Sequence, residues 1–151
     1  MLKFVTGDLL SVDCTYICHQ CNCVTSCGKG LSFALFQKFP YADIYKERKE
    51  KSAPGHIIVK GDGRKERFVV NMMAQYYPGP AKYSNDSTTK RLQWFQDCLD
   101  EMSCLATEHA TFAFPYKIGC GLAGGSWDEY LHLIQMFQKK HNIIVLIVKN
   151  S

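Results

Sequence analysis

The glycine-rich stretch 114–127, with the sequence FPYKIGCGLAGGSW, carries the clearest chemical signal in the chain. It follows the apolar, β-prone run 111–115, which predicts a buried strand. It ends in Ser126-Trp127-Asp128-Glu129, which has the spacing of a capping box between the Ser126 hydroxyl and Glu129. A strand, a glycine-rich loop and a helix N-terminus in this order direct backbone N–H groups and partial positive charge toward one point. The stretch therefore predicts a phosphate site, and a tight turn without a ligand is the alternative.

A second unit of the same kind stands in the first third of the chain. Residues 16–20 predict a strand, and the loop 21–30 that follows carries Asn22 and Gly28-Lys29-Gly30. Residues 31–39 place their apolar side chains on one helical face, and Pro40 ends this helix. Because α/β folds bind ligands at the carboxyl ends of strands, we expect the two glycine loops to converge on one phosphate-bearing ligand.

His19 is the side chain beside these loops whose ordinary pKa suits proton transfer near neutrality. A buried histidine bonded to the backbone fits the same position equally well. Asp8, after the first predicted strand, either caps a turn or accepts a hydrogen bond from the exocyclic amine of a base. The cysteines of the loop 21–30 are weak candidates for a nucleophile, because no C-x5-R phosphatase loop is present.

The chain has eight cysteines and no secretory signal at its N-terminus, which predicts reduced thiols in the cytosol or nucleus. Cys18 and Cys21 have C-x-x-C spacing, but the sequence offers no second pair at the distance a zinc site needs. We therefore expect neither a metal nor another cofactor.

Composition limits the classes of function. With 151 residues, of which 46% are hydrophobic, the chain is expected to form a single domain over residues 1–151. The net charge of +4 comes from dispersed basic residues, so nucleic acid is the weakest candidate partner. No apolar run approaches the roughly 20 residues of a membrane span, and no membrane partner is expected.

The remaining pattern alternates strands and helices. Further strands are predicted at residues 2–5, 57–60, 67–73 and 143–148, helices at 41–52, 92–106 and 126–140, and a mobile loop at 75–87. The strands at 57–60 and 67–73 flank Gly61-Asp62-Gly63 and form a predicted hairpin. This order predicts an α/β fold in which helices cover both faces of a mixed sheet.

Taken together, Gly7-Asp8-Leu9, Asn22 with the loop 28–30, and residues 115–127 resemble a macrodomain over nearly the whole chain. The resemblance implies a three-layer α/β/α fold with a mostly parallel sheet, and binding of ADP-ribose. We also expect a monomer. Asp8 would contact the adenine amine, Asn22 the distal ribose, and the two glycine loops the diphosphate. The expected ligand-binding residues are Asp8, Leu9, Asn22, Ser26, Cys27, Gly28, Lys29, Gly30, Leu31, Ile118, Gly119, Cys120, Gly121, Leu122, Ala123 and Gly124.

The run 118–125 is similar to the macrodomain branch that holds the yeast-type ADP-ribose 1″-phosphate phosphatase and the terminal ADP-ribose protein glycohydrolase. The glycohydrolase uses a strand lysine and a loop aspartate. Here residues 70–75 read VNMMAQ and the loop position is Ala123, so its lysine-dependent chemistry is not expected. The segment 19–23 is similar to the phosphatase, including its histidine.

The leading prediction from this resemblance is hydrolysis of ADP-ribose 1″-phosphate, with His19 as the catalytic residue. The loop N–H groups near residues 28–30 and Lys29 would stabilise the phosphate charge. The alternative is a non-catalytic reader of ADP-ribose or ADP-ribosylated proteins, and deacetylation of O-acetyl-ADP-ribose ranks below both.

Overall fold

The computed structural model describes residues 1–63, 67–120 and 124–150, and contains one six-stranded sheet. The strands lie in the order β1 (Leu2–Thr6), β6 (Ile144–Lys149), β5 (Thr111–Pro115), β2 (Tyr16–Gln20), β4 (Phe68–Met72) and β3 (Ile57–Gly61). The neighbouring pairs are parallel except for the hairpin of β3 and β4, which is antiparallel. The mixed, mostly parallel sheet predicted from the sequence is confirmed.

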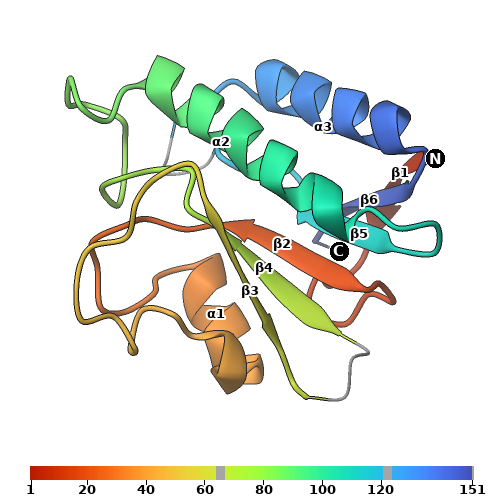
Figure 1. The fold of residues 1–151 in the computed structure, drawn as a ribbon, viewed down its shortest axis with the longest axis horizontal. Coiled ribbons are helices and arrows are strands. Elements are labelled where there is room, and N and C mark those ends of the chain that lie inside the picture. Colours follow the sequence, from red (N-terminus) through yellow and green to blue (C-terminus); the bar gives the residue numbers. More distant parts are fainter. Residues whose placement is uncertain (64–66, 121–123, 151) are drawn as a thin grey trace.

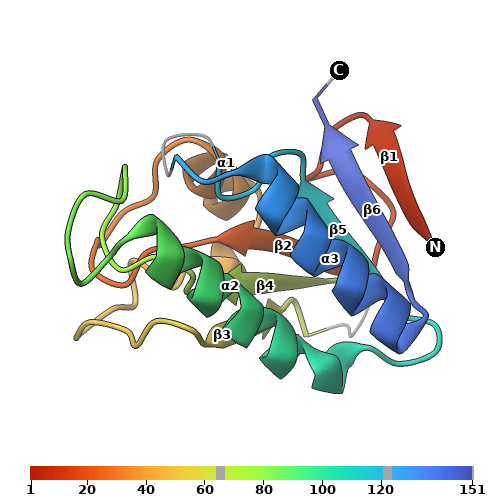
Figure 2. The same cartoon turned by 90° about the horizontal axis from the view of Figure 1, so that it is seen from above.

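Helices cover both faces of this sheet, as Figures 1 and 2 show. The long helices α2 (Thr88–Met102) and α3 (Trp127–His141) pack side by side on one face, and α1 (Leu31–Lys38) covers the other. Two short 3₁₀ turns, η1 (Pro40–Ala42) and η2 (Ser103–Leu105), follow α1 and α2. The three-layer α/β/α arrangement expected from the sequence is therefore present.

The period of two along the strands divides the core into two clusters. Phe112 and Phe114 of β5 belong to the cluster beneath α2 and α3, whereas Ala113 between them belongs to the cluster beneath α1. In the same way Val70 faces α2 and α3, and Val69 faces α1. Burial on both faces explains why these strands are apolar throughout rather than alternating with polar residues.

The helix predicted at residues 41–52 is wrong. Apart from the 3₁₀ turn η1, this segment consists of turns and irregular chain. The carboxylate of Asp43 accepts hydrogen bonds from the backbone N–H groups of Tyr45 and Lys46 at 3.0 and 3.2 Å, which forms a turn. Ile44 and Tyr45 are buried in the cluster beneath α1. Tertiary burial of these two side chains therefore decides the conformation, against the helical tendency of the charged residues that follow.

The capping box predicted at the start of α3 is also wrong. Ser126 is the N-cap residue of α3, but its side chain makes no capping hydrogen bond within the described helix. Asp128 and Glu129 in the first turn still place negative charge at the positive end of the helix dipole. In α2, by contrast, the Ser87 hydroxyl accepts a hydrogen bond from the Lys90 backbone N–H at 3.1 Å. In the part of the chain that the structure describes, no helix is long and apolar enough to span a bilayer.

Candidate ligand-binding site

A cavity of about 450 Å³ opens at the carboxyl ends of β2 and β5. From β2 the chain continues toward β3 and β4, and from β5 it continues toward β6, so the strand order reverses here. This is the place where α/β folds bind ligands, and the volume suits a small molecule. Its walls are formed by Gln20, Asn22, Thr25, Cys27, Lys29, Gly30, Leu31, Ser32, Tyr45, Gln75, Pro78, Gly79, Pro115, Tyr116, Lys117, Ile118 and Gly119.

The two glycine loops meet at this cavity. Seven of the residues expected from the sequence to bind ligand line it: Asn22, Cys27, Lys29, Gly30, Leu31, Ile118 and Gly119. The positions Ser26, Gly28, Cys120 and Gly124 do not line the described cavity, although they belong to the same loops. Gly121, Leu122 and Ala123 lie outside the described residues. The convergence itself was expected from the two strand–loop–helix units.

Asp8 and Leu9 lie apart from this cavity. Asp8 follows β1, at the same edge of the sheet but beyond β6. Its carboxylate accepts hydrogen bonds from the Leu10 backbone N–H at 2.9 Å and the Ser11 hydroxyl at 3.1 Å, so it caps a turn. Leu9 is buried in the core cluster beneath α1. Contact of Asp8 with an adenine amine stays a prediction.

The N-terminus of α1 opens into the cavity without a side-chain cap. Its N-cap residue is Gly30, which has no side chain to accept the first helical N–H groups. A Cβ atom at Gly28 would lie 3.0 Å from the Phe33 backbone nitrogen, so the loop folds closely over the helix end. Lys29 adds a positive charge to the same wall. Uncapped N–H groups, the helix dipole and a lysine are together suited to binding an anion.

The second loop is held against the sheet by close packing. Gly119 has φ of 78°, and a Cβ atom there would lie 2.7 Å from the Tyr130 ring of α3. The Gly125 backbone N–H donates to the Gly119 carbonyl at 2.9 Å, which closes the described ends of this loop. Glycine at position 119 is therefore required both by the backbone conformation and by the neighbouring ring.

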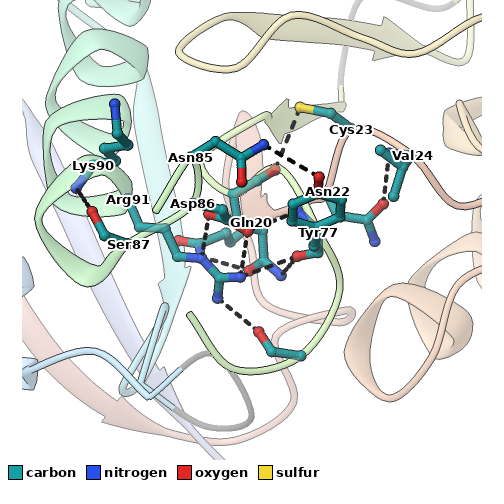
Figure 3. A network of polar contacts seen from close by, with 12 residues as sticks. Gln20, Asn22, Cys23, Val24, Tyr77, Asn85, Asp86, Ser87, Lys90 and Arg91 are labelled. Atoms are coloured by element: carbon teal, nitrogen blue, oxygen red, sulfur yellow. Dashed lines mark hydrogen bonds and ion pairs between the residues drawn. The ribbon is translucent and has the colours of Figure 1, made fainter. Parts of the chain in front are cut away.

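Asn22 presents a hydrogen-bond donor to the cavity. Its Oδ1 atom accepts hydrogen bonds from the Val24 backbone N–H at 3.0 Å and from the backbone N–H and hydroxyl of Thr25 at 2.9 and 3.0 Å (Figure 3 shows the bond from Val24). The Nδ2 group is thus the part of the amide left for a ligand. A sugar hydroxyl can accept from it.

Gln20 carries a buried acceptor that is unpaired among the described residues. Its Nε2 group donates to Gln75 Oε1 at 2.8 Å, and Gln75 Nε2 donates to the Tyr77 carbonyl at 2.9 Å. These bonds fix the orientation of the Gln20 amide and leave its Oε1 atom buried without a partner among the described residues. A buried acceptor without a partner is costly. A Cβ atom at Gly119 would lie 3.1 Å from this oxygen, so the unpaired acceptor faces the second glycine loop. Neither glutamine was predicted as a site residue, although Gln20 ends a predicted strand at the ligand edge of the sheet.

His19 lies beneath the cavity rather than in its wall. Its side chain is 1% exposed, and Nε2 lies 2.6 Å from Asn71 Oδ1. Burial lowers the pKa of His19 from 6.5 to about 4, against the opposing effect of the Asn71 hydrogen bond. A neutral, buried ring cannot serve as a general acid at neutral pH. The geometry thus matches a buried histidine bonded to a side-chain amide, and the position of the ring beneath the cavity wall speaks against proton transfer by His19.

The buried cysteines near the site are protonated thiols. Burial raises the pKa of Cys14 and Cys23 to about 11, and it raises that of Cys18 and Cys21 further. All eight cysteines are unpaired. Nowhere in residues 1–63, 67–120 and 124–150 do three or more His, Cys, Asp or Glu side chains cluster as metal ligands. Cys27 is exposed and lines the cavity.

The loop 75–87, interpreted from the sequence as mobile, is held in place by a buried ion pair (Figure 3). Arg91 of α2 donates through Nε and Nη2 to the two carboxylate oxygens of Asp86 at 2.8 and 2.7 Å, and through Nη1 to the Gly79 carbonyl at 2.7 Å. Asp86 also accepts from the Tyr77 backbone N–H at 2.8 Å. Burial alone would raise the pKa of Asp86, but the hydrogen bonds from Arg91 and Tyr77 outweigh it and lower that pKa. Pro78 and Gly79 thereby form a fixed wall of the cavity.

No protein-family model matches the chain. An uncharacterised 17.5 kDa protein from the tk-vs intergenic region of Enterobacteria phage T4 is 22% identical over 97% of this chain and 96% of its own length. A solved structure of a Bacteroides thetaiotaomicron protein of unknown function is 27% identical and superposes with a TM-score of 0.78, covering 100% of this chain and 98% of its own.

Two further solved structures carry a family name. The macrodomain of Mycobacterium tuberculosis DarG is 19% identical, with a TM-score of 0.74 over 99% of this chain and 97% of its own. The Trypanosoma brucei macrodomain, solved in complex with ADP-ribose, is 12% identical, with a TM-score of 0.66 over 99% of this chain and 63% of its own.

Proposed function

Since this chain has the macrodomain fold, we propose that its cavity binds ADP-ribose. The observation that carries the proposal is the convergence of the two glycine loops on one cavity at the point where the strand order reverses. The uncapped N-terminus of α1 and Lys29 would hold the diphosphate. Asn22 Nδ2 would donate to the distal ribose. The ADP-ribose complex of the Trypanosoma brucei macrodomain supports this choice of ligand.

Recognition of ADP-ribose, free or attached to protein, is the function that the geometry supports best. The described wall of the cavity includes no carboxylate and no histidine, so it offers no side chain suited to general acid–base catalysis near neutrality. Strand β4 carries no lysine, and its Asn71 is buried. This supports the expectation that lysine-dependent removal of ADP-ribose is absent.

Hydrolysis of ADP-ribose 1″-phosphate is the second candidate. It is supported by the concentration of phosphate-stabilising groups, namely the α1 N–H groups, Lys29 and Lys117. Positioning and electrostatic stabilisation account for most of the catalysis of phosphoryl transfer. The reaction proposed here therefore depends on these groups and not on His19 as a proton donor.

Calorimetry with ADP-ribose tests the binding proposal. Lys29→Ala should weaken binding about tenfold, because a charge-assisted hydrogen bond to phosphate is lost. Lys139→Ala, which removes an exposed lysine near the end of α3, is the matched control and should leave the affinity unchanged. Equal effects of the two substitutions, or no binding by the intact protein, would overturn the proposal.

Phosphate release from ADP-ribose 1″-phosphate then separates the two candidates. Release that persists with a chelator, is inhibited by excess ADP-ribose and falls in Lys29→Ala supports the phosphatase. Binding without release leaves the protein as a reader.

A further inference from the structure

A hydrogen-bonded chain of three polar residues leads from the centre of the sheet into the cavity. Asn71 of β4 contacts His19 of the adjacent strand β2, and the His19 Nδ1 atom lies 3.4 Å from the hydroxyl of Ser32. Asn71 and His19 are buried, whereas Ser32, in the first turn of α1, is partly exposed and lines the cavity. Ser32 is thus the cavity end of this chain.

The orientation of the Asn71 amide determines which atom donates in each hydrogen bond. The Asn71 Nδ2 group donates to the carbonyls of Ile58 and Ala42 at 3.1 and 3.4 Å, so its Oδ1 atom is the acceptor that faces His19. At 2.6 Å from that oxygen, His19 Nε2 must carry a proton, because two acceptors at this distance would repel each other.

Nδ1 of His19 is then the unprotonated nitrogen of a neutral ring. Burial keeps the ring neutral by lowering its pKa to about 4. The Phe36 ring packs edge-on against the imidazole, with ring centres 5.4 Å apart, and this contact holds the ring in its orientation. Two donors lie within reach of Nδ1, the Ser32 hydroxyl at 3.4 Å and the Cys21 thiol at 3.8 Å. The hydroxyl is the nearer and the stronger donor, so its proton is assigned to the contact between Ser32 Oγ and His19 Nδ1.

We propose that the chain from Asn71 through His19 to Ser32 fixes the Ser32 hydroxyl as a hydrogen-bond acceptor toward the cavity, so that this position selects a ligand group that donates. Phosphate oxygens at neutral pH only accept, so they gain nothing from an oxygen whose proton is already committed. A sugar hydroxyl both donates and accepts. It can donate to Ser32 Oγ while it accepts from Asn22 Nδ2.

This assignment divides the cavity into two chemical parts. The backbone of the α1 N-terminus and Lys29 offer donors alone and suit phosphate, whereas Ser32 Oγ offers an acceptor and suits hydroxyl groups. The inference rests on the proposed binding of ADP-ribose, whose distal ribose supplies these hydroxyl groups. Within this scheme Ser32 is a specificity-determining residue, and His19 and Asn71 are positioning residues.

A comparison of ADP-ribose with ADP, which lacks the distal ribose, tests the inference. Ser32→Ala should weaken ADP-ribose binding about five- to tenfold, because one hydrogen bond is lost, and should change ADP binding less than about twofold. Ser103→Ala is the matched control, since Ser103 also bonds to a histidine, His141 at 3.0 Å, but outside the cavity. It should alter neither affinity.

The result can separate this inference from the proposed function. If the intact protein binds neither ADP nor ADP-ribose, the proposed function fails and the ligand assignment fails with it. If both bind, and Ser32→Ala weakens both equally or neither, only the inference is overturned.

The tautomer of His19 gives a second, independent test that needs no substitution. Long-range proton–nitrogen NMR correlations of the imidazole should show the proton on Nε2 in the free protein. The ring nitrogens should shift on addition of ADP-ribose and shift much less with ADP. A proton on Nδ1 would overturn the inference, because Ser32 would then be an acceptor toward His19.

Discussion

The buried ion pair between Asp86 and Arg91 should be the most sensitive polar contact of the protein. The exposed fractions of the two side chains are 0% and 1%, and the pair is bidentate, with distances of 2.8 and 2.7 Å. Replacement of Asp86 by Ala removes the carboxylate that pairs with the buried Arg91 charge, and it also removes the acceptor of the Tyr77 backbone N–H. Loss of one partner from a buried pair typically costs about 3 to 5 kcal/mol. We expect a decrease of that size in the free energy of unfolding.

Equilibrium unfolding in urea at neutral pH measures this decrease. The matched control is Glu47→Ala, which breaks the exposed pair of Glu47 with Lys60 at 3.3 Å. An exposed pair contributes about 0 to 1 kcal/mol, so the control should be close to the wild type. Equal decreases in the free energy of unfolding for Asp86→Ala and Glu47→Ala would refute the reasoning, since burial would then have no effect on how much an ion pair stabilises the protein.

The same substitution should also act on the ligand. Arg91 holds the Gly79 carbonyl, and Gly79 lines the cavity. If the wall at residues 77–79 is ordered in only a fraction of the molecules, the apparent affinity for ADP-ribose equals the intrinsic affinity multiplied by that fraction. Asp86→Ala should therefore weaken ADP-ribose about three- to tenfold in calorimetry at a temperature where the variant is folded. Unchanged affinity would show that the ion pair holds the loop without shaping the site.

Three further outcomes follow from the structure. The pKa of His19 is about 4 in the folded protein and about 6.5 in the unfolded chain. The unfolded state therefore binds more protons between these pH values. As the pH falls from 7 to about 5, this difference should lower the free energy of unfolding by about 2 kcal/mol. Urea unfolding of the wild type and His19→Gln at both pH values checks this, and the same pH dependence in both would contradict it. Gly119→Ala should destabilise the protein by about 1 to 3 kcal/mol more than Gly63→Ala. Both glycines have a positive φ, but of the two only position 119 would bring a Cβ atom against an aromatic ring. Equal decreases in melting temperature for the two variants would contradict this steric clash. ADP-ribose should slow thiol labelling of Cys27 in the cavity wall and leave the exposed Cys104 unaffected, as mass spectrometry of labelled peptides can show; no protection of Cys27 would place the ligand elsewhere.

The sequence by itself determined the strands and the position of the ligand edge. The strands at residues 16–20 and 111–115 were predicted with the bounds that the structure has, because short apolar runs between turn residues have few other ways to be buried. The two glycine loops were predicted to meet because the carboxyl ends of parallel strands lie at one edge of a sheet. Each of these predictions depends on residues that are close together in the sequence.

Only the tertiary structure decided the chemistry inside that edge. The buried His19 ring bonds to Asn71, which is 52 residues away in the sequence, and no repeating pattern of residue types predicts that contact. The loop 75–87 contains its own anchor, Asp86, but the partner Arg91 lies on a helix whose pattern indicates only packing. The orientation of the Gln20 amide likewise depends on Gln75 in another segment. Hydrogen-bond direction and charge burial arise from pairs of groups that the fold brings together, so they are absent from any single stretch of sequence.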